Sequence, residues 1–196
     1  QNAEVDALYK LDRAGVRVPM PYGCFDGVLL MELVTDGAGQ VAPRLIDVAL
    51  TREQAVEDHA VMMDYVVKML CAGLVHGDLS EFNVLVDDYG PVIIDLPQAV
   101  DAAANNHAQS MLERDVNNIT AYYGLYAPEL LGSNYAKEMW ALYEEGELTP
   151  ETILTGLFQE DESAADVDGL ILEIKAVMEE EEKRQQRLLE AEQDEV

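Results

Sequence analysis

The sequence has few basic residues, few cysteines and no long apolar run. Only 12 of its 196 residues are Lys or Arg, against 39 Asp or Glu, and the formal net charge is -27. This acidic excess argues against a broad basic surface for nucleic acid or anionic lipid. The apolar stretches are too short or too interrupted to span a bilayer, and no secretory leader pattern opens the sequence. We therefore expect a soluble cytoplasmic protein without a membrane partner.

The two cysteines, Cys24 and Cys71, stand far apart and belong to no Cys-x-x-Cys or Cys/His cluster. Their spacing argues against a zinc site and against a disulfide-rich secreted scaffold. We expect two buried, reduced thiols. The chain is 49% apolar, which is enough for one mid-sized domain with a core but short for two complete domains.

Apolar periodicity, caps and turn signals predict an α+β fold that is mainly helical. One long helix is expected after Thr51, because Thr51 and Gln54 can form a capping box, and it should end at Gly73. A hairpin is expected around the turn-rich segment 87–90, which separates two β-branched runs. The other predicted elements are a helix over 3–13, a buried strand over 28–34, a short helix over 42–50, the hairpin strands 83–86 and 92–95, and helices from 105 onward.

The second half of the sequence is predicted to be helical with three breaks. These fall at 124–128, 146–150 and 160–166. Thr149 followed by Pro150 predicts a helix start, with Pro at the first helical position. A last amphipathic helix over 167–178 is expected to lead into an acidic helical or disordered tail, 179–196.

Three polar residues around the predicted hairpin have a spacing that suits phosphoryl transfer. Segment 76–83 reads His-Gly-Asp-Leu-Ser-Glu-Phe-Asn, so Asp78 and Asn83 share a loop that leads into a strand, and Asp95 ends the partner strand. Asp78 would orient an attacking hydroxyl, while Asn83 and Asp95 would hold Mg²⁺ against phosphates. Taken singly, each residue could serve only a turn or a strand end. The occurrence of all three residues at this spacing favours phosphoryl transfer over three unrelated structural roles.

Around these residues the sequence resembles the C-terminal lobe of protein-kinase-like enzymes, and specifically the RIO-type atypical serine/threonine kinases. The resemblance runs from about residue 3 to residue 123. Besides 76–83 it is carried by Glu4, 14–19 (Ala-Gly-Val-Arg-Val-Pro), 30–33 (Leu-Met-Glu-Leu), 42–45 (Ala-Pro-Arg-Leu), 93–100 (Ile-Ile-Asp-Leu-Pro-Gln-Ala-Val) and 114–118 (Arg-Asp-Val-Asn-Asn).

The resemblance implies a C-terminal kinase lobe with a short catalytic hairpin and without its N-terminal lobe. On this interpretation, 1–27 corresponds to the kinase C-helix and its connector, and 28–40 to the hinge strand and hinge. Residues 41–178 form the helical lobe with the catalytic hairpin at 74–96, and 179–196 the tail. No glycine-rich phosphate loop or strand lysine precedes Glu4 in the sequence. We therefore expect the isolated chain to be weak or inactive as an enzyme.

The resemblance also implies a role for individual residues, with ATP and Mg²⁺ or Mn²⁺ as cofactors. Asp78 corresponds to the catalytic aspartate, and Asn83 and Asp95 to the metal ligands. Glu4 corresponds to the helix glutamate that pairs with a phosphate-binding lysine. The hinge residues that would meet the nucleotide are Met31, in the gatekeeper position, Glu32, Leu33 and Val34.

Three further residues are expected to support the site. His76 should pack and hydrogen-bond the loop backbone rather than act as a base. Asp115 is expected either to anchor the catalytic loop from a buried position or to stand as a plain acid near a helix start. Ser80 replaces the catalytic-loop lysine of ordinary protein kinases. Gly77 replaces the arginine that in those kinases binds a phosphorylated activation loop. Regulation by loop phosphorylation is therefore not expected.

The function implied is ATP-dependent phosphoryl transfer to a protein Ser/Thr hydroxyl. A variant is ATP hydrolysis through phosphorylated Asp95, as a switch in ribosome maturation, with a ribosome-assembly particle as partner. A small-molecule phosphotransferase of the aminoglycoside or choline kinase-like group shares the His-x-Asp-x-x-x-x-Asn loop, but segments 80–82 and 96–98 disfavour it. A non-catalytic scaffold lobe is a third alternative, against which the intact set of Asp78, Asn83 and Asp95 weighs.

Overall fold

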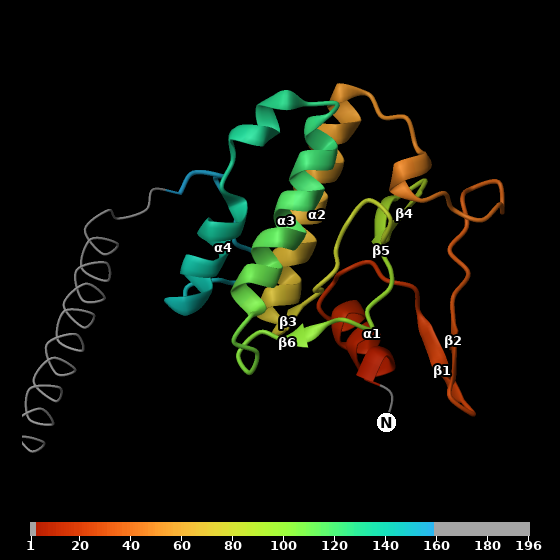
Figure 1. Ribbon diagram of the computed structural model, residues 1–196. Helices are drawn as coiled ribbons and strands as arrows, with labels where there is room; N and C mark the ends of the chain where they lie inside the picture. Colours follow the sequence, from red (N-terminus) through yellow and green to blue (C-terminus); the bar gives the residue numbers. More distant parts are fainter. Residues whose placement is uncertain (1–2, 159–196) are drawn as a thin grey trace, which may run out of the picture. The chain divides into compact units, whose positions relative to one another are not determined.

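The computed structural model describes residues 3–158, which form a mixed, mainly helical α+β unit (Figure 1). The predicted tail and the helix over 167–178 lie outside the described residues. Within them, the six short strands pair into three antiparallel two-stranded sheets, β1–β2, β3–β6 and β4–β5. The elements in order are α1 (Ala3–Arg13), β1 (Pro21–Phe25), β2 (Val28–Met31), the 3₁₀ helix η1 (Leu45–Asp47), α2 (Arg52–Cys71), β3 (Leu74–Val75), β4 (Val84–Asp87), β5 (Gly90–Ile93), β6 (Val100–Asp101), α3 (Ala108–Gly124), the 3₁₀ helix η2 (Pro128–Gly132) and α4 (Tyr135–Glu144).

Helix α2 is the centre of the core, and its predicted start is confirmed. Thr51 Oγ1 accepts a hydrogen bond from Gln54 N at 3.2 Å, and Thr51 N donates to Gln54 Oε1 at 2.9 Å, which completes the capping box. Helix α3 lies beside α2, and α4 packs against both (Figure 1). The facing side chains of α2 and α3 belong to one buried cluster, which includes Met62, Val66, Leu70, Leu112, Val116 and Ile119.

The predicted hairpin is confirmed as β4–β5, with Asp87 paired to Gly90 across a two-residue turn. It packs against α2 on the side away from α4 (Figure 1). Two backbone hydrogen bonds tie it to earlier parts of the chain: Ile93 N donates to Arg17 O at 2.9 Å, and Val86 N donates to Pro43 O at 2.9 Å. The hairpin is thus held between the connector after α1 and the segment before η1.

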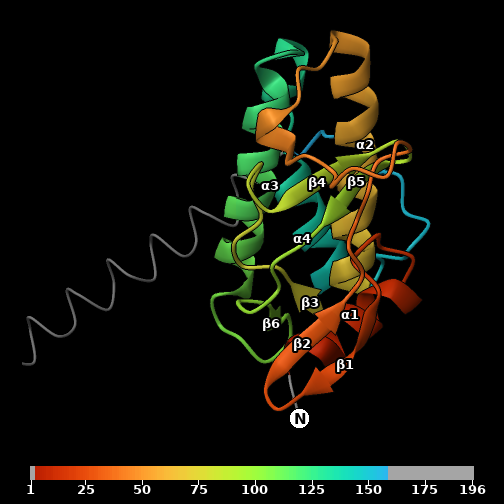
Figure 2. The same ribbon diagram turned by 90° about the vertical axis from the view of Figure 1, so that its right-hand side faces the viewer.

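The prediction of a buried strand over 28–34 is wrong in extent and in burial. Strand β2 ends at Met31, and Val28, Leu30 and Leu33 are 68%, 52% and 68% exposed. It pairs with β1 through a turn in which Asp26 and Gly27 both have positive φ, +49° and +81°. The β1–β2 hairpin lies at one end of the described part, beside α1 (Figure 2), and no described element covers its outer face. An apolar run in the sequence indicates that a segment can be buried, but it does not specify an element that covers that segment.

Three other expectations are corrected. The helix over 42–50 is only the 3₁₀ turn η1, because the residues before it run extended beside β4. Thr149 begins a turn rather than a helix, closed by its N–H to Thr152 Oγ1 at 2.9 Å. Cys24 is exposed and Cys71 half-buried, so the thiols are not both core residues. Among residues 3–158 no helix is long and apolar enough to cross a membrane.

Candidate active site

Asp95 is positioned by the residue before it, because both backbone polar groups of Ile94 are held. Ile94 N donates to Asn83 O at 3.0 Å, and Ile94 O accepts from His76 Nε2 at 3.0 Å. The end of the β5 strand is therefore fixed to the loop that precedes β4. Asp95 itself has a positive φ of +67° and is exposed. The structure thus brings the predicted metal ligands Asn83 and Asp95 to the same end of the hairpin.

His76 has the structural contacts that the sequence predicted. It is 2% exposed, and while its Nε2 donates to Ile94 O, its Nδ1 accepts from Asp78 N at 3.3 Å. This pair of roles requires the neutral ring with its proton on Nε2. Burial lowers the pKa of His76, which favours the same neutral form. His76 therefore links loop 76–83 to the segment after β5 that carries Asp95, which lies beyond the end of the strand predicted to include it.

Asp78 and Asn83 are in direct contact. Asn83 Nδ2 donates to Asp78 O at 2.8 Å and lies 3.4 Å from Asp78 Oδ2. Asn83 N donates to Ser80 O at 3.0 Å, which closes the loop between them. With its Nδ2 used in this way, the amide of Asn83 has its Oδ1 left to meet a cation. The Asp78 carboxylate is on an exposed residue, where an incoming hydroxyl can reach it.

Asp115 on α3 anchors the catalytic loop. Its two carboxylate oxygens accept from Gly77 N at 2.7 Å and from Leu79 N at 3.0 Å, and the residue is 1% exposed. Burial raises the pKa of Asp115, while these two N–H donors oppose that rise. Of the two roles left open for Asp115, the contacts are those of a buried anchor. Because Gly77 and Leu79 flank Asp78, α3 fixes the backbone on both sides of the predicted catalytic residue.

Two neighbours of Asp115 add to this anchor and were not identified from the sequence. Arg114 donates to Gly77 O, and Asn118 Nδ2 donates to Leu79 O at 3.3 Å. The signal was available, because residues four apart on a helix share a face. Both lie in segment 114–118, where a supporting role was predicted for Asp115 alone.

Gly77 is required by its surroundings. Its φ is +85°, and a Cβ there would lie 2.7 Å from Gln98 O and 2.7 Å from Met111 Cε. Both the backbone conformation and the close approach exclude a side chain. Loop 76–83 therefore packs closely against the segment that follows Asp95.

A cleft of about 350 Å³ joins the hinge to the predicted metal ligands. It brings together residues from α1, the hinge, the segment before η1, strand β4 with the loop before it, and the segment after β5. Asp78, His76, Ser80 and Asp115 are absent from its lining and belong to the adjoining loop. The cleft is lined by Glu4, Pro19, Met31, Glu32, Leu33, Val34, Val41, Arg44, Leu85, Asn83, Ile94 and Asp95.

The hinge backbone is held at both ends. Glu32 N donates to Met20 O at 2.9 Å, and Val34 O accepts from Ala42 N at 3.0 Å. The Glu32 side chain accepts from Met20 N at 3.1 Å. Among the described residues no acceptor faces Val34 N, so this group can donate to a ligand in the cleft.

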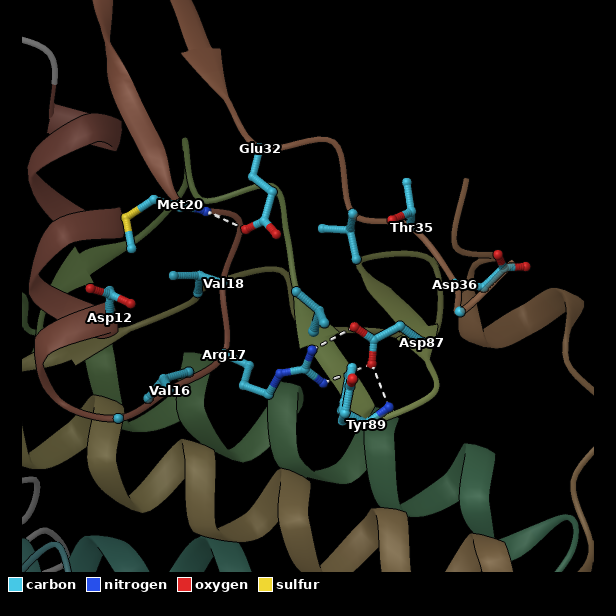
Figure 3. A pocket seen from close by; sticks show the side chains of 14 residues that line it. Asp12, Val16, Arg17, Val18, Met20, Glu32, Thr35, Asp36, Asp87 and Tyr89 are labelled. Atoms are coloured by element: carbon cyan, nitrogen blue, oxygen red, sulfur yellow. Dashed lines mark hydrogen bonds and ion pairs between the residues drawn. The ribbon is translucent and has the colours of Figure 1, made fainter. Parts of the chain in front are cut away.

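A second cavity, of about 590 Å³, shares Glu32 and Val34 with the cleft, and Figure 3 shows the residues that line it. It is larger, but it includes none of the predicted catalytic or metal residues. Its charged centre is Arg17, which donates to Asp87 through both terminal nitrogens and to Gly90 O at 3.2 Å. The guanidinium also lies 5.8 Å from the centre of the Tyr89 ring. We therefore assign the candidate active site to the smaller cleft.

The donor set of the cleft fits a magnesium ion. Within the cleft Asn83 offers an amide oxygen and Asp95 a carboxylate. A second carboxylate, that of Asp78, lies in the adjoining loop next to the Asn83 amide. No group of three His, Cys, Asp or Glu residues among 3–158 could by itself enclose a metal ion. Mg²⁺ is commonly bound in this way, by one or two carboxylates with phosphate oxygens and water completing its shell.

Comparison with known proteins gives one family. A RIO domain profile matches residues 1–135. The chain is 40% identical over 116 residues to the RIO-type serine/threonine-protein kinase Rio1 of Haloferax volcanii, covering 59% of this chain and 39% of that protein. It is 34% identical over 120 residues to Rio1 of Thermoplasma acidophilum, covering 61% of each. Against human serine/threonine-protein kinase RIO1 it is 33% identical over 121 residues, covering 61% of this chain and 21% of that protein. The matched part thus spans less than two thirds of each of these relatives.

Proposed function

The chain belongs to the RIO domain family, and we propose that it carries the catalytic and metal-binding part of an ATP-dependent serine/threonine protein kinase. The observation that supports this most directly is the cleft in which the hinge residues meet Asn83 and Asp95. A phosphoryl-transfer enzyme needs such a meeting point, because its catalysis is mostly positioning and charge neutralisation. In this proposal the described residues correspond to a C-terminal kinase lobe with its hinge.

The proposed roles follow from the contacts. Asn83 Oδ1 and the Asp95 carboxylate hold Mg²⁺, which when bound neutralises charge on the phosphates. Asp78 accepts a hydrogen bond from the attacking hydroxyl and orients it toward the phosphoryl group. Its backbone is fixed for this task by Asp115 on α3 and by His76. Ser80 closes the loop through its carbonyl oxygen.

The hinge is the proposed adenine-binding segment. Val34 N donates to the base, and Met31 and Leu33 supply apolar contact on the cleft wall. Glu4, on α1 at the other side of the cleft, is proposed as the acid that pairs with a phosphate-binding lysine of the whole protein. The 196-residue chain alone is proposed to bind ATP weakly, because none of the described residues that line its cleft is a lysine.

Protein hydroxyls are the proposed acceptors, and the cytoplasm is the proposed setting. The relatives are serine/threonine-protein kinases by name, which supports the acceptor class. A role as an ATP-driven switch in ribosome maturation rests on the family resemblance alone.

The experiment uses the full-length protein with labelled ATP, Mg²⁺ and a general basic protein substrate. We expect Asp78→Asn and Asp95→Asn each to lower phosphate incorporation by about 100-fold or more, since a group that contacts the reacting phosphate is typically worth several kcal/mol. Asp88→Asn, an exposed turn residue of the same hairpin, is the matched control and should retain activity.

Three results would contradict the proposal in different ways. Transfer to an aminoglycoside or choline but not to protein would favour a small-molecule phosphotransferase. ATP hydrolysis without transfer to protein, abolished by Asp95→Asn, would favour the ATPase switch. Full cellular function of both variants would favour a scaffold.

A further inference from the structure

Arg44 lies beside the end of the β4–β5 hairpin that carries the proposed metal ligands Asn83 and Asp95. It forms an isolated antiparallel bridge with Leu85, and Ile46 N donates to Glu81 O at 3.3 Å. The segment around Arg44 therefore follows the chain from Glu81 to Leu85 in the opposite direction. Asn83, a proposed metal ligand, lies midway between these two points of attachment.

The backbone of Arg44 is fixed while its side chain is free to meet a ligand. Arg44 O accepts from Asp47 N at 2.9 Å, and the residue has φ -71° and ψ 152° just before η1. The residue is exposed, and no described residue hydrogen-bonds or pairs with its guanidinium. By contrast, Arg17 and Arg52 have carboxylate partners.

Among residues 3–158, Arg44 is the only cation that lines the cleft. The other charged lining residues, Glu4, Glu32 and Asp95, are acids. Yet Arg44 pairs with none of them. A nucleoside triphosphate carries more negative charge than one Mg²⁺ ion neutralises, so its phosphate oxygens need a further positive partner in this acidic surrounding. The planar guanidinium, with donors in a fixed fork, matches phosphate oxygens well.

We propose that Arg44 binds the phosphate groups of the nucleotide in this cleft, next to the metal held by Asn83 and Asp95. This inference rests on the proposed nucleotide-binding function and adds a residue to it. Arg44 acts on ligand affinity and takes no part in moving the proton of the acceptor. Its contribution grows with the number of phosphates on the ligand and is absent for a ligand that has none.

The test is a titration of the full-length protein with adenosine, MgADP and MgATP. Arg44→Ala should weaken MgATP binding by about 10-fold, as expected for one charge-assisted contact, while adenosine affinity stays unchanged. Arg44→Lys should recover part of the loss, because it keeps the charge but not the fork. Arg52→Ala removes an exposed arginine on α2 and should bind every ligand like the wild type. Unfolding midpoints of all variants check that the Arg44 side chain is not needed for folding.

The outcomes separate the two proposals. If the wild type binds MgATP and Arg44→Ala binds it equally well, this inference is overturned while the proposed function stands. An equal loss of adenosine and MgATP would also overturn it, because Arg44 would then act on the base or on the cleft wall. A raised KM for the protein substrate with unchanged MgATP affinity would assign Arg44 to the acceptor instead. If the wild type binds no nucleotide, the proposed function itself fails.

Discussion

Arg17 and Asp87 form a two-pronged ion pair although 70 positions separate them in the chain. Their side chains are 34% and 7% exposed. Arg17 O also accepts from Ile93 N, so a single residue of the connector after α1 holds both the turn and the last residue of the β4–β5 hairpin. The hydrogen-bonded pair raises the pKa of Arg17 and lowers that of Asp87. The connector after α1 and the β4–β5 hairpin are thereby coupled.

Replacing Arg17 by Met should lower the free energy of unfolding by about 1–2 kcal/mol. The substitution leaves the nearly buried Asp87 carboxylate without its partner, although the partial exposure of Arg17 moderates the effect. Urea denaturation measures the change. In a cycle with Asp87→Asn, the double variant should lose less than the sum of the single losses; strict additivity would mean that the pair is not coupled.

The same pair predicts a stability change in acid. Because the pKa of Asp87 is lower in the folded protein than in the unfolded chain, the pair contributes fully above the unfolded Asp value of about 3.9. Its contribution is lost as the pH falls through the lower, folded value. The stability difference between wild type and Asp87→Asn should therefore shrink below about pH 4. A constant difference from pH 7 to pH 2.5 would argue against this explanation.

His59 predicts a second pH effect in a milder range. It is buried on α2, with Nε2 2.9 Å from Thr120 Oγ1, and burial lowers its pKa to about 4. The unfolded chain therefore takes up a proton near pH 6.5 that the folded protein accepts only near pH 4. Stability is full above about pH 6.5 and should fall by up to about 3 kcal/mol as the pH drops to 4. His76, whose pKa is also lowered, adds a contribution of the same sign.

Denaturation curves between pH 4.5 and pH 7.5 test the His59 prediction. His59→Gln should be less stable at neutral pH but lose less stability on acidification than the wild type. His107→Gln, at an exposed position before α3, is the control and should keep the wild-type pH dependence. Identical pH profiles for all three proteins would contradict the assignment to His59.

Gly77→Ala should disrupt the catalytic loop more than an alanine at another strained glycine. Gly90 also has a positive φ, +113°, but a Cβ there would meet nothing within 4 Å. Gly90→Ala should therefore lower the free energy of unfolding by about 1 kcal/mol, which measures the effect of the positive φ without a collision. Gly77→Ala adds the collision with Gln98 O and should cost at least about 1 kcal/mol more, with loss of phosphoryl transfer. Thermal and urea unfolding of both variants measure the difference, and equal losses would show that the loop can shift without penalty.

Features decided by neighbouring residues were predicted well from the sequence. The capping box at Thr51 and the turn between β4 and β5 are local signals, and both are confirmed. The hydrogen bonds of His76 were also expected, because the spacing of residues 76–83 and 93–100 resembles a known family. The buried anchor found at Asp115 is one of the two roles that the sequence left open for this residue.

Features decided by distant contacts were not predicted. The apolar run of β2 indicated burial, although burial depends on a covering element that the run does not specify. The Asp26-Gly27 pair is a hairpin signal in the sequence, but no partner strand was predicted for segment 28–34. Nothing local marks Arg17 as the partner of Asp87, since the pairing exists only once the hairpin is folded against the connector.

The uncovered face of the β1–β2 hairpin makes the colloidal behaviour of the protein depend on salt. Tyr22, Phe25 and Val28 expose 60–68% of their surface, and such a row favours contact between molecules. At low ionic strength the net charge of -27 keeps copies apart. The screening length shrinks from about 10 Å at 0.1 M salt to about 3 Å at 1 M, so repulsion between molecules fades while apolar attraction persists. For the 196-residue chain we therefore expect solubility to fall as the salt concentration rises.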